Sequence, residues 1–137
     1  MHVMWIKTIF LLIIVSLPLA CNQVPEAKPA PLGDYAALEK LAAAYRQVAE
    51  QYPVQPRVMR PEGRKEFVQK VFTAAGYDYT ETLSHMAQQG VDMTNQDHRD
   101  LAELVLLPHQ GLSDEDREDI YSAEELTSIG AIEAALH

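Results

Sequence analysis

The clearest pattern in the chain is a stripe of apolar residues that begins just after Gly33. Apolar side chains recur there at spacings of three and four residues, which places them on one face of an α-helix. The stripe consists of Tyr35, Leu38, Leu41, Ala42, Tyr45, Val48, Ala49 and Tyr52. Asp34 belongs to the residue types that cap helix N-termini, and Pro53 cannot continue the helix. The sequence therefore predicts a helix that starts after Asp34 and stops at Pro53.

The same organisation repeats toward the C-terminus. After a proline-bearing connection over 53–60, which we expect to be extended, Pro61 opens a second helix that Gly76 ends. Its apolar face holds Phe67, Val68, Val71, Phe72 and Ala75. Further helix starts follow at Asp78, Thr94, Ser113 and Ser122. Because no alternating run of β-branched residues competes, the sequence predicts an all-α domain, a small bundle of five or six helices over residues 34–137.

The residues that precede this domain have a different composition. An uncharged run from Thr8 to Ala20 is shorter than the ~20 apolar residues that cross a bilayer core. A basic residue before it and a small residue at its end are typical of an export signal. Residues 22–33 are rich in proline and poor in apolar side chains, so we expect a flexible tether there. The expected organisation is a cleaved signal peptide over 1–20, a lipidated cysteine and tether over 21–33, and one helical domain.

Cys21 is the only cysteine of the chain, and it directly follows the apolar run. It has no second cysteine with which to form an internal disulfide, and a free thiol is unusual in an exported protein. The segment Leu17-Pro18-Leu19-Ala20-Cys21 resembles the lipobox of bacterial lipoprotein precursors, with Pro18 where Leu is usual. This resemblance covers residues 1–21 and implies cleavage before Cys21 and a covalent lipid on its sulfur. An ordinary secretory signal and an uncleaved anchor are the alternatives.

Proteins that resemble this class are held in the bacterial cell envelope by their acyl chains. Asn22 stands where an Asp, under the enterobacterial sorting rule, retains lipoproteins at the inner membrane. The resemblance therefore implies an outer-membrane protein that faces the periplasm and touches the membrane through its N-terminal lipid.

Charge is distributed unevenly along the chain, which has a formal net charge of −9. Acidic and basic side chains balance over residues 22–91, whereas residues 92–137 hold most of the acidic ones against only Arg99 and Arg117. Such a surface repels nucleic acid and anionic lipid headgroups, so we expect no nucleic-acid partner. It attracts a basic protein or divalent cations, or it serves solubility alone.

The acidic third contains two windows with the outline of an EF-hand loop. In the first, oxygen donors fall at Asp92, Thr94, Gln96, Asp100 and Glu103. Asp97 stands where the loop needs a glycine for its sharp turn, and the second window, over 114–125, departs in the same way. Both windows are also explained as acidic helix starts. We therefore predict no dedicated metal site, with Asp92, Asp100 and Glu103 as the candidate ligands if cations bind.

No catalytic pattern emerges from the sequence. His85, His98 and His109 match no common metal motif, and we expect them to be exposed or to cap helices. Ser84 and His85 are adjacent, so on a helix they diverge and cannot act as nucleophile and base. The chain also lacks G-x-S-x-G, P-loop and H-E-x-x-H motifs. We expect no enzyme, and no cofactor besides the covalent lipid.

Two groups of residues are candidates for contacts with another protein. Tyr35, Tyr45 and Tyr52 share a face of the first helix, where they either pack in the core or anchor an interface. The basic cluster around Pro61 can meet the acidic third of the same chain or an acidic partner. It consists of Arg57, Arg60, Arg64 and Lys65.

The expected function is that of a lipid-anchored envelope protein that acts through protein–protein contacts. Secretin pilotins and immunity proteins offer analogies at the level of class. An acidic domain that binds or senses divalent cations is the alternative, followed by a small periplasmic enzyme.

Overall fold

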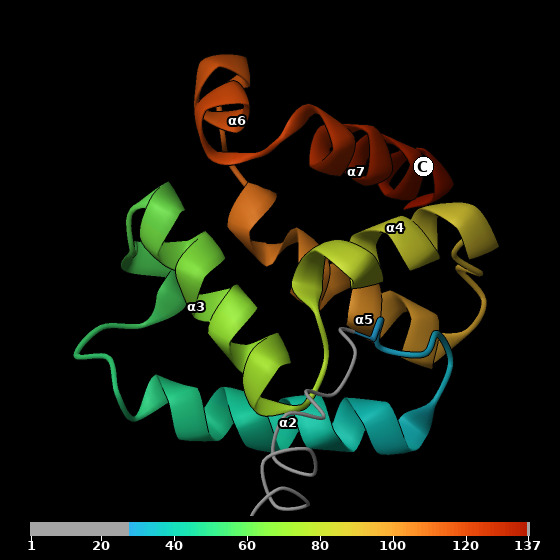
Figure 1. The fold of residues 1–137 in the computed structure, drawn as a ribbon, viewed down its shortest axis with the longest axis horizontal. Coiled ribbons are helices and arrows are strands. Elements are labelled where there is room, and N and C mark those ends of the chain that lie inside the picture. Colours follow the sequence, from blue (N-terminus) through green and yellow to red (C-terminus); the bar gives the residue numbers. More distant parts are fainter. Residues whose placement is uncertain (1–27, 137) are drawn as a thin grey trace, which may run out of the picture.

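The computed structural model describes residues 28–136, and the part of the chain that it describes contains helices and no strands (Figure 1). The α-helices are α2 (Tyr35–Ala49), α3 (Pro61–Ala74), α4 (Tyr79–Gln89), α5 (Gln96–Leu106), α6 (Asp114–Ile120) and α7 (Ala123–Leu136). Two short 3₁₀ turns, η1 (Pro56–Val58) and η2 (Leu107–His109), lie between them. The predicted all-α class and number of helices are confirmed.

The expected signal segment, Cys21 and the outer part of the tether lie outside the described residues. No helix within residues 28–136 combines the length and the apolar character needed to span a bilayer.

Capping residues set most of the helix boundaries, as the sequence predicts. The side chains of Asp34, Asp78 and Ser113 accept backbone N–H groups at the starts of α2, α4 and α6. Ser122 and Glu125 form a reciprocal capping box at α7, in which each backbone N–H donates to the other side chain at 3.0 and 3.1 Å.

Gly76 ends α3 with a left-handed turn, at φ +89°. The Tyr77 N–H donates to the Phe72 carbonyl at 2.8 Å and the Gly76 N–H to the Thr73 carbonyl at 3.0 Å, which is the Schellman pattern. This turn reverses the chain between α3 and α4.

Three predicted boundaries are wrong by a short distance. The α2 helix ends at Ala49 rather than at Pro53, so Tyr52 lies beyond the helix. Asn95, rather than Thr94, caps α5 by accepting the Asp97 N–H at 2.9 Å. The backbone N–H and the hydroxyl of Thr94 instead donate hydrogen bonds to Asp92 Oδ1. Thr94 and Asn95 are both capping residue types, and only one of them can cap the helix. The connection over 53–60 is not wholly extended either, because η1 interrupts it.

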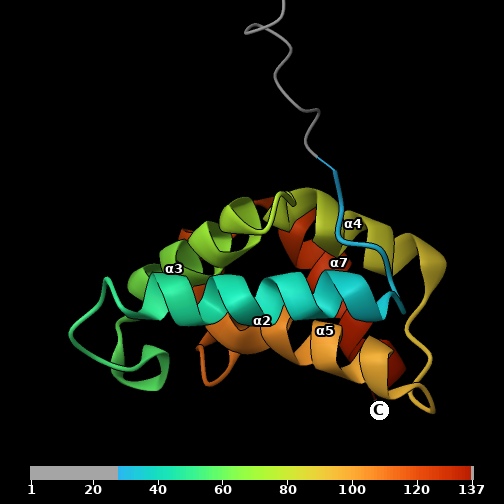
Figure 2. The same cartoon turned by 90° about the horizontal axis from the view of Figure 1, so that it is seen from below.

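The core lies around α3, which packs against α2, α4, α6 and both 3₁₀ turns. Its four predicted aromatic and β-branched residues are fully buried, and they are Phe67, Val68, Val71 and Phe72. The α4 and α7 helices pack closely on each other along one side of the molecule, and α2 crosses the opposite side (Figures 1 and 2).

The buried face of α2 is rotated from the one that the stripe predicts. Its buried residues are Ala37, Leu41, Ala44 and Val48. Ala42 is exposed, and Tyr35 remains 65% exposed. Alanine fits a core and a surface equally well, so the spacing alone left the centre of this face undefined.

The inner end of the expected tether belongs to the folded domain. Ala30 is fully buried, and its N–H donates to Thr82 Oγ1 at 2.9 Å. The Asp78 N–H donates to the Lys28 carbonyl at 2.8 Å, and Leu32 packs against the core. The predicted boundary at Gly33 is therefore wrong, because these backbone and apolar contacts hold residues 28–33 against α4.

Candidate functional site

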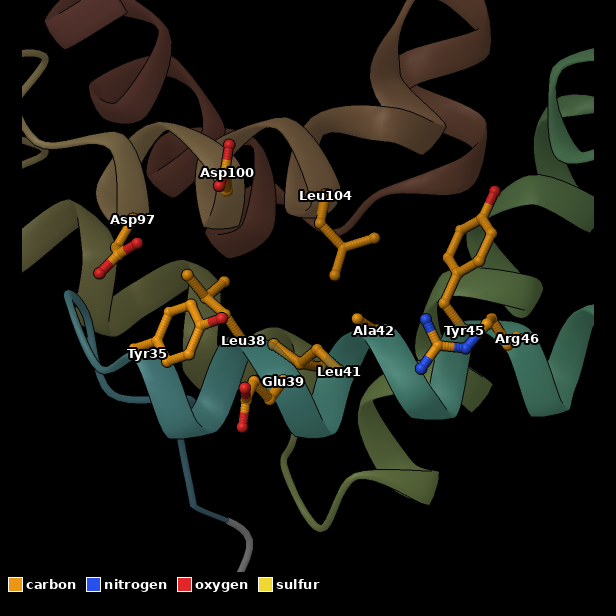
Figure 3. Close-up of a pocket in the computed structure, with 10 residues that line it drawn as sticks. All are labelled: Tyr35, Leu38, Glu39, Leu41, Ala42, Tyr45, Arg46, Asp97, Asp100 and Leu104. Atoms are coloured by element: carbon orange, nitrogen blue, oxygen red, sulfur yellow. The ribbon is translucent and has the colours of Figure 1, made fainter.

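A hollow with a volume of about 460 Å³ lies between α2 and α5 (Figure 3). Its lining residues are Tyr35, Leu38, Glu39, Leu41, Ala42, Tyr45, Arg46, Asp97, Asp100 and Leu104. Its apolar lining comes mostly from α2, with Leu104 from α5. The acidic side chains lie along the half where the two helices begin, and Arg46 lies at the other end. Its volume falls within the range typical of ligand and partner pockets.

The two helices that form the hollow lie alongside each other and run in the same direction. Tyr35 and Leu38 of α2 share one end with Asp97, whereas Tyr45 lies toward Leu104, farther along α5 (Figure 3). The α2 helix makes most of its helix contacts with α3 and fewer with α5. The side of α2 that faces α5 is therefore only partly covered.

A second hollow of about 430 Å³ continues past Tyr45 to the end of α2. Its remaining lining residues are Ala49, Tyr52, Pro53, Val54, Gln55, Pro56, Arg57 and Leu107. We call the two hollows together the α2 groove. The large apolar side chains that stay exposed in residues 28–136 are those of Tyr35, Val54 and Val58, at 65, 49 and 66% exposure. Tyr35 and Val54 line the groove, and Val58 lies next to its lining residue Arg57.

The three tyrosines of the predicted stripe take two different roles. Tyr45 and Tyr52 each meet the ring of Phe67 edge-on, with centroids 5.1 and 5.3 Å apart. These contacts hold both rings in place as a wall of the groove. Tyr35 packs on no aromatic ring in the described part of the chain and projects at the open end of the first hollow. Tyr45 and Tyr52 therefore pack against the core, and Tyr35 is exposed.

Charge in the groove changes sign from one end to the other. The acidic side chains of Glu39, Asp97 and Asp100 line the end where α2 and α5 begin, and Arg46 and Arg57 line the far part. Within residues 28–136, none of these five side chains takes part in a salt bridge. Asp100 accepts a hydrogen bond from the neutral Gln96 side chain, so no ion pair neutralises any of the five charges in this part of the chain.

The four residues of the basic cluster predicted around Pro61 are split between internal contacts and the exposed surface. Lys65 Nζ lies 3.0 Å from Glu125 Oε1, donates to the Ile120 carbonyl at 2.8 Å, and stands 4.7 Å from the centre of the Tyr121 ring. Arg64 donates to the Gln110 carbonyl at 3.1 Å. These two residues meet the C-terminal third of the same chain, whereas Arg57 and Arg60 remain exposed.

Glu125 lies at the centre of this internal polar cluster. Burial alone raises the pKa of its carboxyl, but hydrogen bonds from the Ser122 backbone, Lys65 and Thr80 outweigh burial, so the pKa lies below its ordinary value. Nearby, Tyr79 donates to the Val105 carbonyl at 2.6 Å. The cluster ties α3, α4 and the start of α7 together.

The candidate calcium ligands are not brought together. Asp92 accepts hydrogen bonds from the backbone and hydroxyl of Thr94, which lower the pKa of its carboxyl. Asp100 accepts from Gln96 at 2.7 Å, and Glu103 is exposed on α5. Within residues 28–136, no group of three or more His, Cys, Asp or Glu side chains is gathered closely enough to hold a metal ion.

His109 is buried, so the expectation of an exposed or capping histidine is wrong for it. It meets Glu133 of α7, and its ring lies edge-on to that of Tyr121. Burial lowers the pKa of His109, and the Glu133 carboxylate only partly offsets this. His98 also departs from the expectation, since it is half-buried and its Nδ1 accepts the N–H of Asp92, a loop residue, at 3.0 Å.

The α2 groove is the feature that sequence reasoning missed. The tyrosine stripe indicated its α2 wall, but nothing in the pattern placed α5 beside that wall. Comparison with protein-family models, curated proteins and solved structures finds no match to this chain. Function is therefore inferred from the geometry of the groove and from the N-terminal sequence.

Proposed function

We propose that this protein is a lipid-anchored accessory protein of the bacterial cell envelope that binds another envelope protein through the α2 groove. The observation that carries the proposal is the groove itself, an apolar hollow lined by tyrosines and by charges that have no salt-bridge partner within residues 28–136. Tyrosine and arginine are enriched among the residues that dominate binding at protein interfaces.

The N-terminal sequence supports the anchor. The lipobox-like segment that ends at Cys21 predicts a lipid on that residue. Because the folded domain includes Lys28, the chain between it and Cys21 can reach at most about 25 Å. This is shorter than a tether that runs to Gly33 would allow. The groove would therefore stay near the membrane surface, which favours a partner that is itself close to the membrane.

The other expected functions have less support. The carboxylates proposed for cation binding are separated or engaged in hydrogen bonds within residues 28–136. The buried His109–Glu133 pair does not line either hollow of the groove, so it is not placed to meet a substrate there.

Site-specific photo-crosslinking in cells tests the docking surface. A photo-reactive phenylalanine analogue would replace Tyr35 in the full-length chain, and the matched control would carry it in place of Gln88, which is exposed on α4. We expect a discrete crosslinked protein from position 35 and none from position 88. Equal crosslinking from both positions, or none from either, would count against the groove as a docking surface.

Metabolic labelling with a palmitate analogue tests the anchor separately. The wild-type chain should incorporate label and sediment with membranes, whereas Cys21→Ser should do neither. The melting temperature of the folded domain should stay the same, because that domain is held together by contacts of residues 28–136. Membrane association without any lipid on Cys21 would contradict the proposed anchor.

A further inference from the structure

The α2 groove has the dimensions of a site for one more helix. The two hollows follow α2 from Tyr35 to Ala49, which corresponds to about 21 Å at 1.5 Å per residue. A helix of about 14 residues has this length. Since α2 and α5 lie alongside each other (Figure 2) and a mainly apolar hollow lies between them, a third helix can lie along both.

The floor of the groove suits a helix with one apolar face. Its apolar lining comes mostly from α2 and is completed by Leu104 of α5 and Leu107 of η2; the α2 residues are Leu38, Leu41, Ala42, Tyr45 and Ala49. An amphipathic helix places apolar residues at i, i+3, i+4 and i+7 along one side, so it can contact such a floor over its full length.

The order of charges along the groove indicates the direction in which a bound helix would run. Acidic side chains line the end where α2 and α5 begin, and Arg46 and Arg57 line the far part. Helices favour acidic residues in their first turn and basic residues in their last, because these complement the helix dipole. Such a helix matches both ends of the groove only when its last turn lies beside Tyr35 and Asp97.

We infer that the α2 groove binds an amphipathic helix of a partner protein, which lies antiparallel to α2 and α5 with its basic C-terminal end beside Glu39, Asp97 and Asp100. The inference rests on the proposed function, because it specifies what the docking surface binds. The order of charges along the groove favours the antiparallel direction, and its apolar lining favours an amphipathic helix.

Two other occupants fit the structure less well. A peptide that binds as an added β-strand needs a sheet edge, and residues 28–136 contain no sheet. The described part of a second copy offers no exposed helix with a large apolar face. The large apolar side chains exposed in residues 28–136 are Tyr35, Val54 and Val58, and these belong to the groove or its edge.

Two stapled peptides test the assignment on the purified full-length protein. Both have about 14 residues and the same leucine stripe, and stapling equalises their helicity. One carries two Glu in its first turn and two Lys in its last, and the other carries these charges in reverse order. We expect the first to bind about fivefold more tightly at low salt, with the preference shrinking at high salt. NMR shift changes should centre on Leu38 and Leu104.

A charge-reversed variant provides the matched control. Glu39→Lys, Asp100→Lys and Arg46→Glu together should invert the preference between the two peptides, and each position is exposed, so the fold should persist. Equal affinity of both peptides for the wild-type protein would overturn the antiparallel orientation. Shift changes away from the groove would overturn the site.

Two results separate a wrong helical partner from a wrong docking surface. If position 35 crosslinks to a protein in cells but neither stapled peptide binds at millimolar concentration, the groove docks a partner and the helical occupant is wrong. If neither a crosslink nor peptide binding is found, the docking surface itself is wrong. Self-association that depends on Arg46 would replace the partner helix with a second copy.

Discussion

The side of the molecule formed by α3, α4 and α7 pairs its charged side chains internally, whereas the side formed by α2 and α5 leaves several of them without a salt bridge. On the first side, Lys65 and Glu125 meet at 3.0 Å and are completed by the Ile120 carbonyl and Thr80. On the second, Arg46 and Asp100 line an open apolar hollow and form no salt bridge within residues 28–136. Residues of the same kinds stabilise the fold in one region and remain available for binding in the other.

This difference separates stability from function. The closed side contributes cohesion, so substitutions there should change the free energy of unfolding. The groove side contributes a surface, so substitutions there should change binding and leave the free energy of unfolding almost unaltered.

The largest expected effect comes from the core on which both sides rest. Phe72 is fully buried and meets the ring of Tyr79 edge-on at 5.5 Å. Phe72→Ala should therefore lower the free energy of unfolding by about 3 to 5 kcal/mol, measured by urea denaturation. An unchanged unfolding midpoint would show that α3 does not form the centre of the domain.

Removing one member of the internal ion pair comes next. Lys65→Met leaves the buried Glu125 carboxylate without its cation, so we expect a loss of about 2 to 3 kcal/mol in urea denaturation. Lys70→Met is the matched control, since Lys70 pairs with Glu66 on the exposed surface of the same helix. If both variants melt alike, the buried pair has no special role.

The corrected start of the domain is tested by Thr82→Val. Thr82 is fully buried, and its hydroxyl accepts the Ala30 N–H and donates to the Asp78 carbonyl. Valine keeps the shape but leaves that N–H unpaired, so we expect a loss of about 1 to 2 kcal/mol. Faster hydrogen exchange at Ala30 should accompany the loss, and Thr82→Ser should preserve protection.

Acidification should loosen the closed side first at His109. Burial lowers the pKa of His109 in the folded state, and Glu133, Arg117 and Tyr121 are the groups that face or influence it. Its neutral form is favoured by folding. The corresponding stability is present above the ordinary pKa of 6.5 and is lost as the pH falls through the lowered folded value.

The measurement compares urea midpoints at pH 7.5 and 5.5 for the wild type and His109→Phe. The wild type should lose more stability between these values than the variant does. Parallel losses would place the pH sensitivity elsewhere. Glu125, whose pKa is also lowered, contributes only in the more acidic range below its ordinary value of 4.5.

The smallest effect on stability is expected at the groove. Tyr35 is 65% exposed, so Tyr35→Ala should leave the unfolding midpoint nearly unchanged while it weakens partner binding at least tenfold. Gln88→Ala is the control for an exposed helix position with no role in the groove. Destabilisation comparable to that of Phe72→Ala would make Tyr35 a core residue and remove the distinction between the two sides.

The sequence predicted the helices well because local chemistry sets them. Asp34, Asp78 and Ser122 cap helices through their own side chains, and Gly76 provides the left-handed turn. These signals act within a few residues, so a single sequence reveals them. Where two capping residues are adjacent, as at Thr94 and Asn95, the local signal does not choose between them.

The features that sequence missed depend on residues that are distant in the chain. Ala30 is buried and donates its N–H to Thr82 of α4, and His109 is buried and meets Glu133 of α7. The groove exists because α5 lies beside α2, which periodicity cannot report. The tyrosines indicated that this face of α2 could be a binding surface. The depth of the groove, the order of its charges and the packing of Tyr45 on Phe67 depend on the tertiary structure.

The central claim, that the α2 groove binds a protein partner, is tested most directly by scanning photo-crosslinkers over both sides of the domain in living cells. Positions 35, 46 and 54 line the groove, and positions 88 and 134 are exposed on α4 and α7. We expect the three groove positions to crosslink the same protein and the other two positions to crosslink none. Crosslinking of one protein chiefly through 88 and 134 would contradict the claim.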